Sequence, residues 1–227
     1  MDGPPGHGPS IGAPGARWQC GPGGLPIDRP GRWAHKPRGF EEGNGTMRIA
    51  ILGGGHGCYA AAADLSEQGH EVRLWRRDAA ALAPVVETGR IRLKDIAGAR
   101  DVAIALATPD IGTAVRGAEL LLIPSPALAQ EDIAAALAPH LEDGQVVFLP
   151  PGTFGSVVMD RIVRARGSRA RVTWAETGTL PYLARKHGPA EVAITIRAVR
   201  LPTGVYPAAR ADEALACIAR AYPSVLP

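Results

Sequence analysis

Cysteine is scarce in this sequence, which has three among its 227 residues: Cys20, Cys58 and Cys217. They are far apart, and none stands in the C-x-x-C spacing that zinc sites and redox motifs use. Three scattered thiols do not make the disulfide framework on which small secreted domains rely. The sequence therefore predicts no metal site and favours a reducing compartment, so we expect the protein in the cytoplasm.

Long apolar runs, aromatic residues and net charge are also scarce. No run approaches the roughly 18 apolar residues of a membrane span, and the first residues lack the apolar core of a secretory signal. The net charge is +3 and aromatic residues make up 5% of the chain, with no basic cluster interleaved with aromatics. We therefore expect neither a membrane nor a nucleic acid as partner.

Residues 1–46 differ in composition from the rest of the chain. They hold twelve of the 28 glycines and eight of the 21 prolines, and their apolar residues are isolated. Such a segment buries too little to offset the entropy of ordering it. We expect a disordered Gly/Pro-rich extension, or an upstream start wrongly chosen for a protein that begins at Met47. Docking of Trp18 or Trp33 is the less favoured alternative.

Residues 47–78 carry the motif around which the chain is organised. An apolar run enters three glycines, an alanine-rich helical segment follows, and a second strand-like run comes after it. A strand, turn, helix and strand with glycines at the first turn is the unit that binds a dinucleotide. The helix start offers free N–H groups and a positive dipole end to the phosphates.

Each position of this turn has an expected role. Gly53 allows the tight turn, Gly55 lets the pyrophosphate approach the backbone, and Cys58 takes the place of the third glycine as a small residue. A second register, Gly55, Gly57 and Ala60, also fits, although Gly53 follows the strand directly. We expect cofactor contacts from Gly53, Gly55, His56, Gly57 and Cys58, and a packing role for the Cys58 thiol rather than nucleophilic chemistry.

The end of the second strand bears on which dinucleotide binds. Enzymes that prefer NAD place an Asp or Glu there for the ribose 2′-hydroxyl, whereas this chain has Arg76 and Arg77. A guanidinium grips a 2′-phosphate bidentately. The sequence predicts NADP as cofactor in preference to NAD. In the alternative, both arginines are solvated and Asp78 reaches the ribose.

From Met47 onward, strands and helices alternate, which predicts a Rossmann-type, doubly wound and mostly parallel sheet with helices on both faces. We expect this dinucleotide-binding domain over 47–200, and a linker and the first helix of a truncated helical domain over 201–227. Ligands lie beyond the carboxyl ends of such strands. The loops expected to line the site are 53–58, 76–78, 124–127, 150–155 and 176–182.

Four more residues in these loops are candidates. Ser125 and Pro126 follow the apolar strand 120–123, and the Ser125 hydroxyl either contacts the nicotinamide ribose or caps the turn. Glu176 and Thr177 end a later strand, where they either line a substrate pocket or shape the turn.

Several segments resemble the nucleotide-binding half of the octopine/nopaline (opine) dehydrogenase family, from Met47 to about Ala221. The matching pieces are ILGGGHGCYAAAADL, GHEVRLW, AVRGAELLLIPSPALAQEDIAAALAPHLEDGQVVFLPPGT, AETGTLPYLAR and GPAEVAITI. The resemblance implies an NAD(P)-dependent oxidoreductase that condenses an amino acid with a 2-oxo acid by reducing their imine. Its partners would be a nicotinamide dinucleotide and these two small molecules, whose identity the sequence does not reveal.

The chain also departs from that family. Members usually carry Asn at the place of His56 and His at the place of Gln130, and a second, helical domain supplies a catalytic His with a carboxylate partner. This sequence stops at Pro227, and we identify no catalytic residue in it. His140 and His187 lack a carboxylate orienter in a predicted cleft. We expect the chain alone to be inactive.

Three alternatives stay open. One is a non-catalytic nucleotide-binding module or gene fragment. Another is a dehydrogenase of ketopantoate reductase or glycerol-3-phosphate dehydrogenase type, although the latter needs a lysine where this chain has Pro150, Pro151 and Gly152. The third, a structural interaction protein, is disfavoured by the glycine turn.

Overall fold

The computed structural model of this protein describes residues 45–227, which belong to one compact unit. The extension predicted over 1–46 lies, apart from its last two residues, outside the described residues. Within the described part, no helix is both long and apolar enough to cross a membrane.

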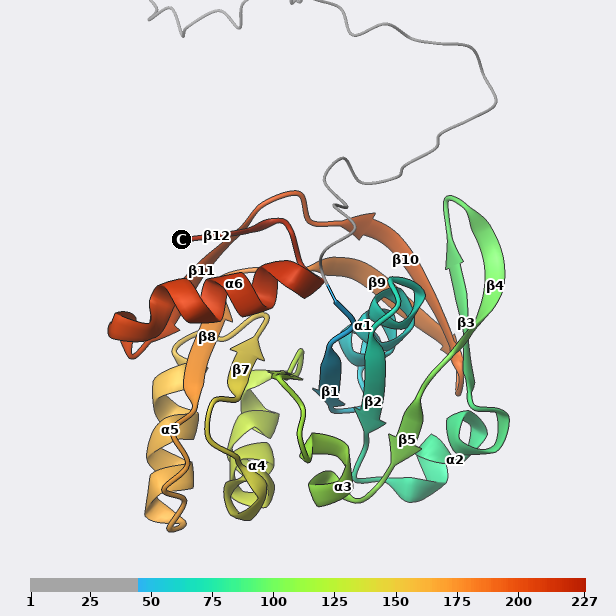
Figure 1. Cartoon of the computed structure of the whole chain (residues 1–227). Coiled ribbons are helices and arrows are strands. Elements are labelled where there is room, and N and C mark those ends of the chain that lie inside the picture. The colour runs from blue at the N-terminus through green and yellow to red at the C-terminus, as the bar shows by residue number, and fades with distance from the viewer. Residues whose placement is uncertain (1–44) are drawn as a thin grey trace, which may run out of the picture. The chain divides into compact units, whose positions relative to one another are not determined.

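An eight-stranded sheet forms the centre of the fold (Figure 1). Its order is β12-β11-β8-β7-β6-β1-β2-β5, and the six strands from β8 to β5 are parallel. β1 lies between β2 and β6, so the strand order reverses beside it, as in a dinucleotide-binding sheet. The strands are β1 Arg48–Leu52, β2 Glu71–Trp75, β5 Leu106–Thr108, β6 Leu120–Leu122, β7 Val146–Leu149, β8 Thr173–Thr177, β11 Leu201–Tyr206 and β12 Val225–Leu226.

Helices cover both faces of this sheet, which confirms the doubly wound architecture. Side chains alternate along a strand, so Ile49 and Ile51 of β1 enter one apolar cluster and Ala50 and Leu52 enter the other. The first cluster includes α1, α2 and α6, and the second includes α3, α4 and α5. The helices are α1 His56–Glu67, α2 Ala79–Thr88, α3 Ile111–Val115, α4 Ala127–Leu137, α5 Gly155–Ala165 and α6 Ala211–Ala221, with short 3-10 turns at Ala138–His140 and Ala208–Arg210.

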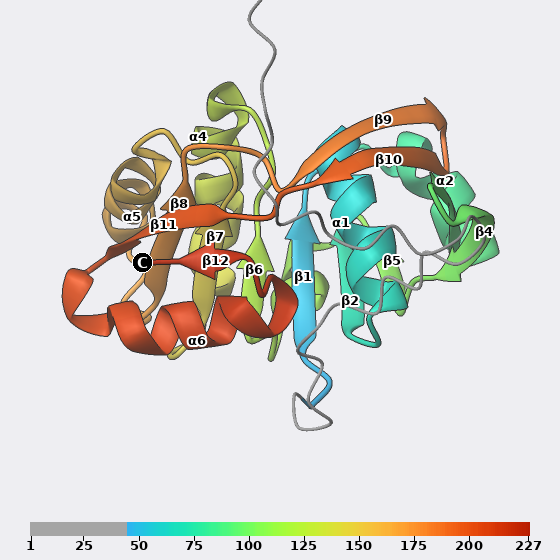
Figure 2. The ribbon, with the colours of Figure 1, turned by 90° about the horizontal axis from the view of Figure 1, so that it is seen from above.

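A second, four-stranded sheet lies against α1. Figure 2 shows β9 and β10 beside this helix. Its order is β4-β3-β10-β9, with β3 Arg90–Asp95, β4 Gly98–Ala103, β9 Tyr182–Gly188 and β10 Glu191–Arg197. β3 and β4 come between β2 and β5 in the sequence but do not join the parallel sheet. The physical reason is the two-residue link between β3 and β4, which is too short for a crossover and produces an antiparallel hairpin.

α1 lies between the main sheet and the second sheet, and its alanine-rich sequence suits this position. Ala60, Ala61, Ala62 and Ala63 are all fully buried, because one side of the helix faces the main sheet and the other faces the second sheet. Small side chains allow such close approach on both sides.

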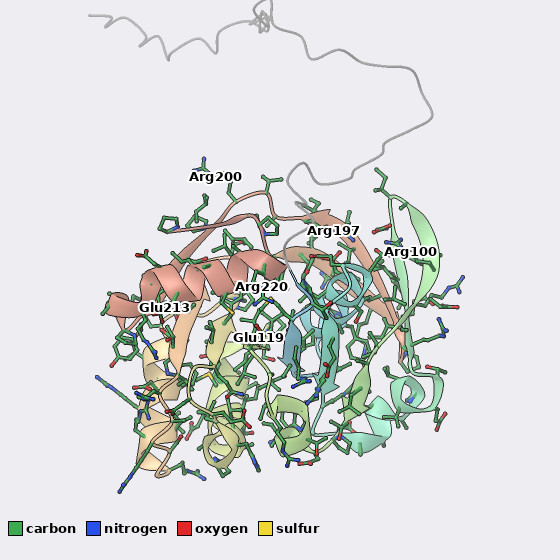
Figure 3. All side chains as sticks on the ribbon, in the orientation of Figure 1. Arg100, Glu119, Arg197, Arg200, Glu213 and Arg220 are labelled. Atoms are coloured by element: carbon green, nitrogen blue, oxygen red, sulfur yellow. The ribbon has the colours of Figure 1, made fainter. Side chains whose placement is uncertain are left out.

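Charged side chains join α1 to the second sheet. Arg197 of β10 donates to Asp64 of α1 at 2.7 Å and to Asp95 of β3 at 2.9 Å. Arg100 of β4 pairs with the same Asp95 and with Glu67 of α1. Figure 3 labels Arg100 and Arg197 on this side of the molecule. These pairs hold the second sheet in a defined position over the helix.

Residues beyond 200 extend the main sheet. The segment 201–206, expected as a linker, is β11, which pairs antiparallel with β8 and places Thr203 opposite Thr177. The helix expected within 201–227 is α6, which packs against β7, β8 and β11. The sheet therefore continues past the position where the sequence suggests a domain boundary.

Candidate functional site

The glycine turn connects the carboxyl end of β1 to α1. The Gly53 N–H donates to the Trp75 carbonyl at 2.9 Å, and the φ of Gly53 is +134°, a conformation that side-chain-bearing residues rarely adopt. A Cβ at this position would lie 2.5 Å from the Ser125 Oγ and 2.8 Å from the Cys58 Sγ. Glycine is therefore required here by both backbone and packing.

Gly55 faces open space. It is the N-cap residue of α1, its φ of −78° suits any residue, and a Cβ built on it would meet nothing within 4 Å. It supplies no side chain to cap the helix, and the first turn of α1 has no acidic residue. The free N–H groups of a helix start attract anions. The geometry leaves room for a phosphate to approach this backbone.

Gly57 and Cys58, in the first turn of α1, pack this helix against the sheet. A Cβ on Gly57 would lie 3.2 Å from the Pro124 Cβ. The Cys58 Sγ is buried, 3.8 Å from the Pro124 carbonyl oxygen and 3.9 Å from that of Leu52. Burial raises the pKa of this thiol. Both observations fit the packing role expected for Cys58, because a reactive cysteine needs a stabilised thiolate.

Arg76 lies beside the glycine turn. A Cβ on Gly54 would come within 2.6 Å of the Arg76 Cδ and Nε, and the guanidinium donates to the Ala81 carbonyl at 3.3 Å. Its ion pair with Asp78 is long, at 3.8 Å. Asp78 itself caps α2, accepting from the Ala81 N–H at 3.0 Å. The Arg76 guanidinium thus lies next to the expected phosphate site, whereas the Asp78 carboxylate caps the N-terminus of α2.

Arg77 takes a different direction. Its guanidinium pairs with Asp132 of α4 at 3.0 Å, and both side chains are exposed. The structure therefore does not group the two arginines: Arg76 borders the glycine turn and Arg77 already has an anionic partner.

Lys186 of β9 lies beside the candidate site, and the sequence alone did not indicate it. Its N–H donates to the His56 Nδ1 at 3.0 Å, and its Nζ lies 3.3 Å from the centroid of the Tyr59 ring. Burial, and then the charge of Arg76, lowers its pKa to about 8. No local motif marks this lysine, because it reaches α1 only once β9 has packed against that helix.

Ser125 and Pro126 lie at the carboxyl end of β6. The buried Ser125 Oγ donates to the Leu52 carbonyl at 3.2 Å, which ties the loop after β6 to the end of β1. Pro126 is exposed and is the N-cap residue of α4. The Ser125 hydroxyl thus has an internal partner, and a contact with the nicotinamide ribose stays a prediction.

Glu176 and Thr177 hold the loop after β7. The Glu176 carboxylate accepts from the N–H groups of Phe154 and Ser156, both at 2.9 Å, and so caps α5. Phe154 has a left-handed φ of 63°, which is costly for such a residue. The Thr177 hydroxyl donates to the Thr179 carbonyl. These side chains shape their loop, and a substrate contact by either one stays a prediction.

In the part of the chain that the structure describes, neither candidate histidine makes a hydrogen bond or an ion pair to a carboxylate. His140 lies against Gly112 of α3, and His187 is an exposed residue of β9. Among residues 45–227, no group of His, Cys, Asp and Glu can hold a metal ion.

Two hollows of the surface lie away from this turn. One, of about 480 Å³, is lined by the amino-terminal residues of β1 and β2, including Arg48 and Glu71. The other, of about 580 Å³, lies near Glu119 and Arg220 at the same edge of the sheet. Ligands of such sheets lie at the opposite, carboxyl edge. The candidate site is therefore the open surface around the glycine turn.

The sequence of this chain is similar to known dinucleotide-dependent dehydrogenases. Residues 48–152 match the family model described as the N-terminus of NAD-dependent glycerol-3-phosphate dehydrogenase. An opine dehydrogenase of Arthrobacter sp. (strain 1C) is 32% identical over 182 residues, which cover 80% of this chain and 50% of that protein. The chain carries the N-terminal domain of the opine dehydrogenase family. It spans about half the length of this curated relative.

Solved structures of this family share the fold. Octopine dehydrogenase in complex with NADH and agmatine superposes with a TM-score of 0.66 at 20% identity, over 80% of this chain and 48% of that one. Yersinopine dehydrogenase with bound NADP⁺ gives a TM-score of 0.58 at 19% identity, over 80% and 47% of the two chains. One of these family members is thus solved with NADH and the other with NADP⁺.

Proposed function

We propose that residues 45–227 bind a nicotinamide dinucleotide for an NAD(P)-dependent oxidoreductase of opine dehydrogenase type. The observation that carries this proposal is the start of α1, where Gly55 faces open space, no acidic side chain lies in the first turn and Arg76 lies alongside. Anions are stabilised at such a helix start. The matches to opine dehydrogenase and to an NAD-dependent family model support the same conclusion.

Each part of the turn has a task in this proposal. Gly53 allows the chain to leave β1 within hydrogen-bond distance of β2, and Gly55 leaves the helix N–H groups accessible to the pyrophosphate. Gly57 and Cys58 keep α1 close to the loop after β6. The bound nicotinamide would supply or accept the hydride. The residues of this chain bind and orient it at the carboxyl edge of the sheet.

The proposed overall reaction is the reductive condensation of an amino acid with a 2-oxo acid. It rests on the family, because the chain spans about half of its curated relative and the described residues include no catalytic acid with an orienting partner. The amino acid and the oxo acid are therefore left unassigned.

A glycerol-3-phosphate dehydrogenase activity is the second candidate, favoured by the description of the matching family model. Such enzymes need a lysine soon after the fifth strand of the parallel sheet. Here β7 is followed by Pro150, Pro151 and Gly152, which argues against this activity.

Dinucleotide binding tests the proposal directly. Titration of NAD and NADP by calorimetry should show saturable binding of at least one of them. Gly55→Leu should abolish this binding without unfolding the protein, since its φ is ordinary and its surroundings are open. Gly204→Leu is the matched control, because Gly204 lies on β11 with equally open surroundings. Absence of binding to the unmodified chain, or equal binding by the Gly55 variant, would contradict the proposal.

A further inference from the structure

Lys186 is a half-buried cation without an anionic partner. None of the ion pairs among the described residues includes it, although twelve other basic side chains take part in such pairs. The groups that face it are Arg76, His56, Cys58 and Tyr59. Desolvating an ammonium without a counter-charge costs free energy. Its position therefore calls for an explanation beyond packing.

The position of Lys186 is set by two contacts with α1. Its backbone donates to His56, the first residue of the helix, and its ammonium lies over the Tyr59 ring. β9 is in turn fixed to α1 by Tyr182, whose hydroxyl donates to Asp64 at 2.9 Å. The lysine is thus held over the first turn of α1 by rigid elements rather than by a loop.

Positive charge gathers around the glycine turn from three directions. Arg76 comes from the end of β2, Lys186 comes from the second sheet, and the positive end of α1 lies between their segments. Arg76 and Lys186 repel one another. A ligand with two negative charges removes this repulsion and satisfies both cations.

We propose that Lys186 and Arg76 together bind the 2′-phosphate of NADP. One of the two cations that favour NADP over NAD is then a residue of the second sheet. The proposal rests on the proposed function, since it requires the dinucleotide to bind at this turn. Arg76 occupies the position where the ribose 2′ group lies in dinucleotide-binding folds. Lys186 would contact the same phosphate from the side of the second sheet. Arg77 takes no part, because Asp132 already neutralises it.

A purely structural role for Lys186 predicts a different result. A lysine over an aromatic face is attracted by the electron density of the ring, and this contact would be the same with either cofactor. The phosphate clamp instead predicts that removal of the charge affects NADP and leaves NAD unchanged. Affinity for the two dinucleotides therefore separates the two roles.

The test uses Lys186→Met, which keeps most of the apolar stem and removes the charge. Arg185→Met is the matched control, because its exposed side chain is adjacent in β9 and points to the other face of the strand. We expect Lys186→Met to weaken NADP binding about tenfold, as for a loss of about 1.4 kcal/mol, with NAD binding unchanged within twofold. Arg185→Met should change neither.

Three outcomes would overturn the clamp. Lys186→Met leaving NADP affinity unchanged would mean that the lysine only packs on Tyr59. Equal weakening of NAD and NADP would place Lys186 at the pyrophosphate. NAD binding without NADP binding by the unmodified chain would also refute it, yet leave the proposed function standing. Failure to bind either dinucleotide refutes the proposed function itself.

The pH dependence gives an independent readout. With a pKa of about 8, the free lysine loses its proton above that pH, whereas a bound phosphate retains the charged form. NADP affinity should fall as the pH rises from 7.5 to 9.5, and binding at pH 8.5 should take up a proton. Calorimetry in two buffers of different ionisation enthalpy measures this uptake. Lys186→Arg should keep its NADP affinity over that range, and a flat profile in the unmodified chain would contradict the clamp.

Discussion

The Tyr182 hydroxyl donates a hydrogen bond to the Asp64 carboxylate at 2.9 Å, joining β9 to α1 across 118 residues of sequence. Tyr222, which follows α6, meets the same hydroxyl at 3.2 Å. The second sheet, the helix that begins at the candidate site and the last helix thus meet at one buried polar group. Because Lys186 lies on the same strand as Tyr182, this bond also positions the proposed phosphate clamp.

The first prediction concerns this bond. Tyr182→Phe removes the donor and leaves Asp64 with Arg197 as its remaining charged partner, so the free energy of unfolding should fall by about 1.5–3 kcal/mol, as for a lost hydrogen bond to a charged group. Urea unfolding measures the change. Tyr206→Phe, at a half-exposed position, should cost less than about 0.5 kcal/mol. Equal stability of Tyr182→Phe and the unmodified chain would show that the bond contributes nothing.

The second prediction concerns pH. The His70 Nδ1 accepts from the Met47 N–H at 3.3 Å, and burial lowers the pKa of His70. Arg220 and Glu119 are the charged groups facing it, and they pair with each other at 2.6 Å; Figure 3 labels both. A histidine with a lowered folded-state pKa stabilises the fold above its unfolded value of about 6.5, and this stability is lost as the pH falls below it.

The check is the free energy of unfolding between pH 5 and pH 8. The unmodified chain should lose stability below about pH 6.5, and His70→Asn, whose amide oxygen can accept from Met47, should lose less over the same interval. Identical slopes for the unmodified chain and His70→Asn would refute the assignment to His70.

The third prediction separates packing from ligand access within the glycine turn. Gly53→Ala requires a Cβ within 2.8 Å of two neighbouring side-chain atoms at a φ of +134°, so it should destabilise the fold by about 1–3 kcal/mol. Gly55→Ala meets nothing and should leave stability within about 0.5 kcal/mol. Thermal unfolding of the two variants compares them directly. A larger loss for Gly55→Ala would reverse the roles given to the two glycines.

The β1–α1–β2 unit could be predicted from sequence because it is local. The glycines stand directly after an apolar run, and the positions of Gly53, Gly57 and Cys58 depend on neighbours within the same unit and on the loop after β6. The parallel sheet could also be predicted from the sequence, since most of its strands contain short apolar runs. The first residue of a helix is harder to predict from apolar spacing, because the first turn need not carry the pattern; α4 begins at Ala127, directly after its N-cap residue Pro126.

The second sheet could not be predicted, for a physical reason. Its strands β9 and β3 are about 90 residues apart in the sequence, and β9 has the mixed sequence YLARKHG, in which nothing distinguishes Lys186 from its neighbours Arg185 and His187. Only the packing of β9 on α1 gives that lysine its place. The same holds for Asp78, whose choice between capping α2 and reaching the ribose depends on the start of that helix.

The last prediction concerns the cofactor preference read from Arg76. Its guanidinium lies over Gly54, has one backbone acceptor at 3.3 Å and pairs with Asp78 only at 3.8 Å, so it is available to a 2′-phosphate. We expect tighter binding of NADP than of NAD. Arg76→Ala should weaken NADP by roughly 1.5–3 kcal/mol, the range of a charge-assisted hydrogen bond, and leave NAD nearly unchanged. Arg77→Ala is the control, since its partner Asp132 lies on α4 and its loss should affect neither dinucleotide. Titration of both cofactors by calorimetry decides the matter: NAD binding as tight as NADP binding, or an Arg77 variant that loses NADP as Arg76→Ala does, would show that Arg76 does not select the phosphate.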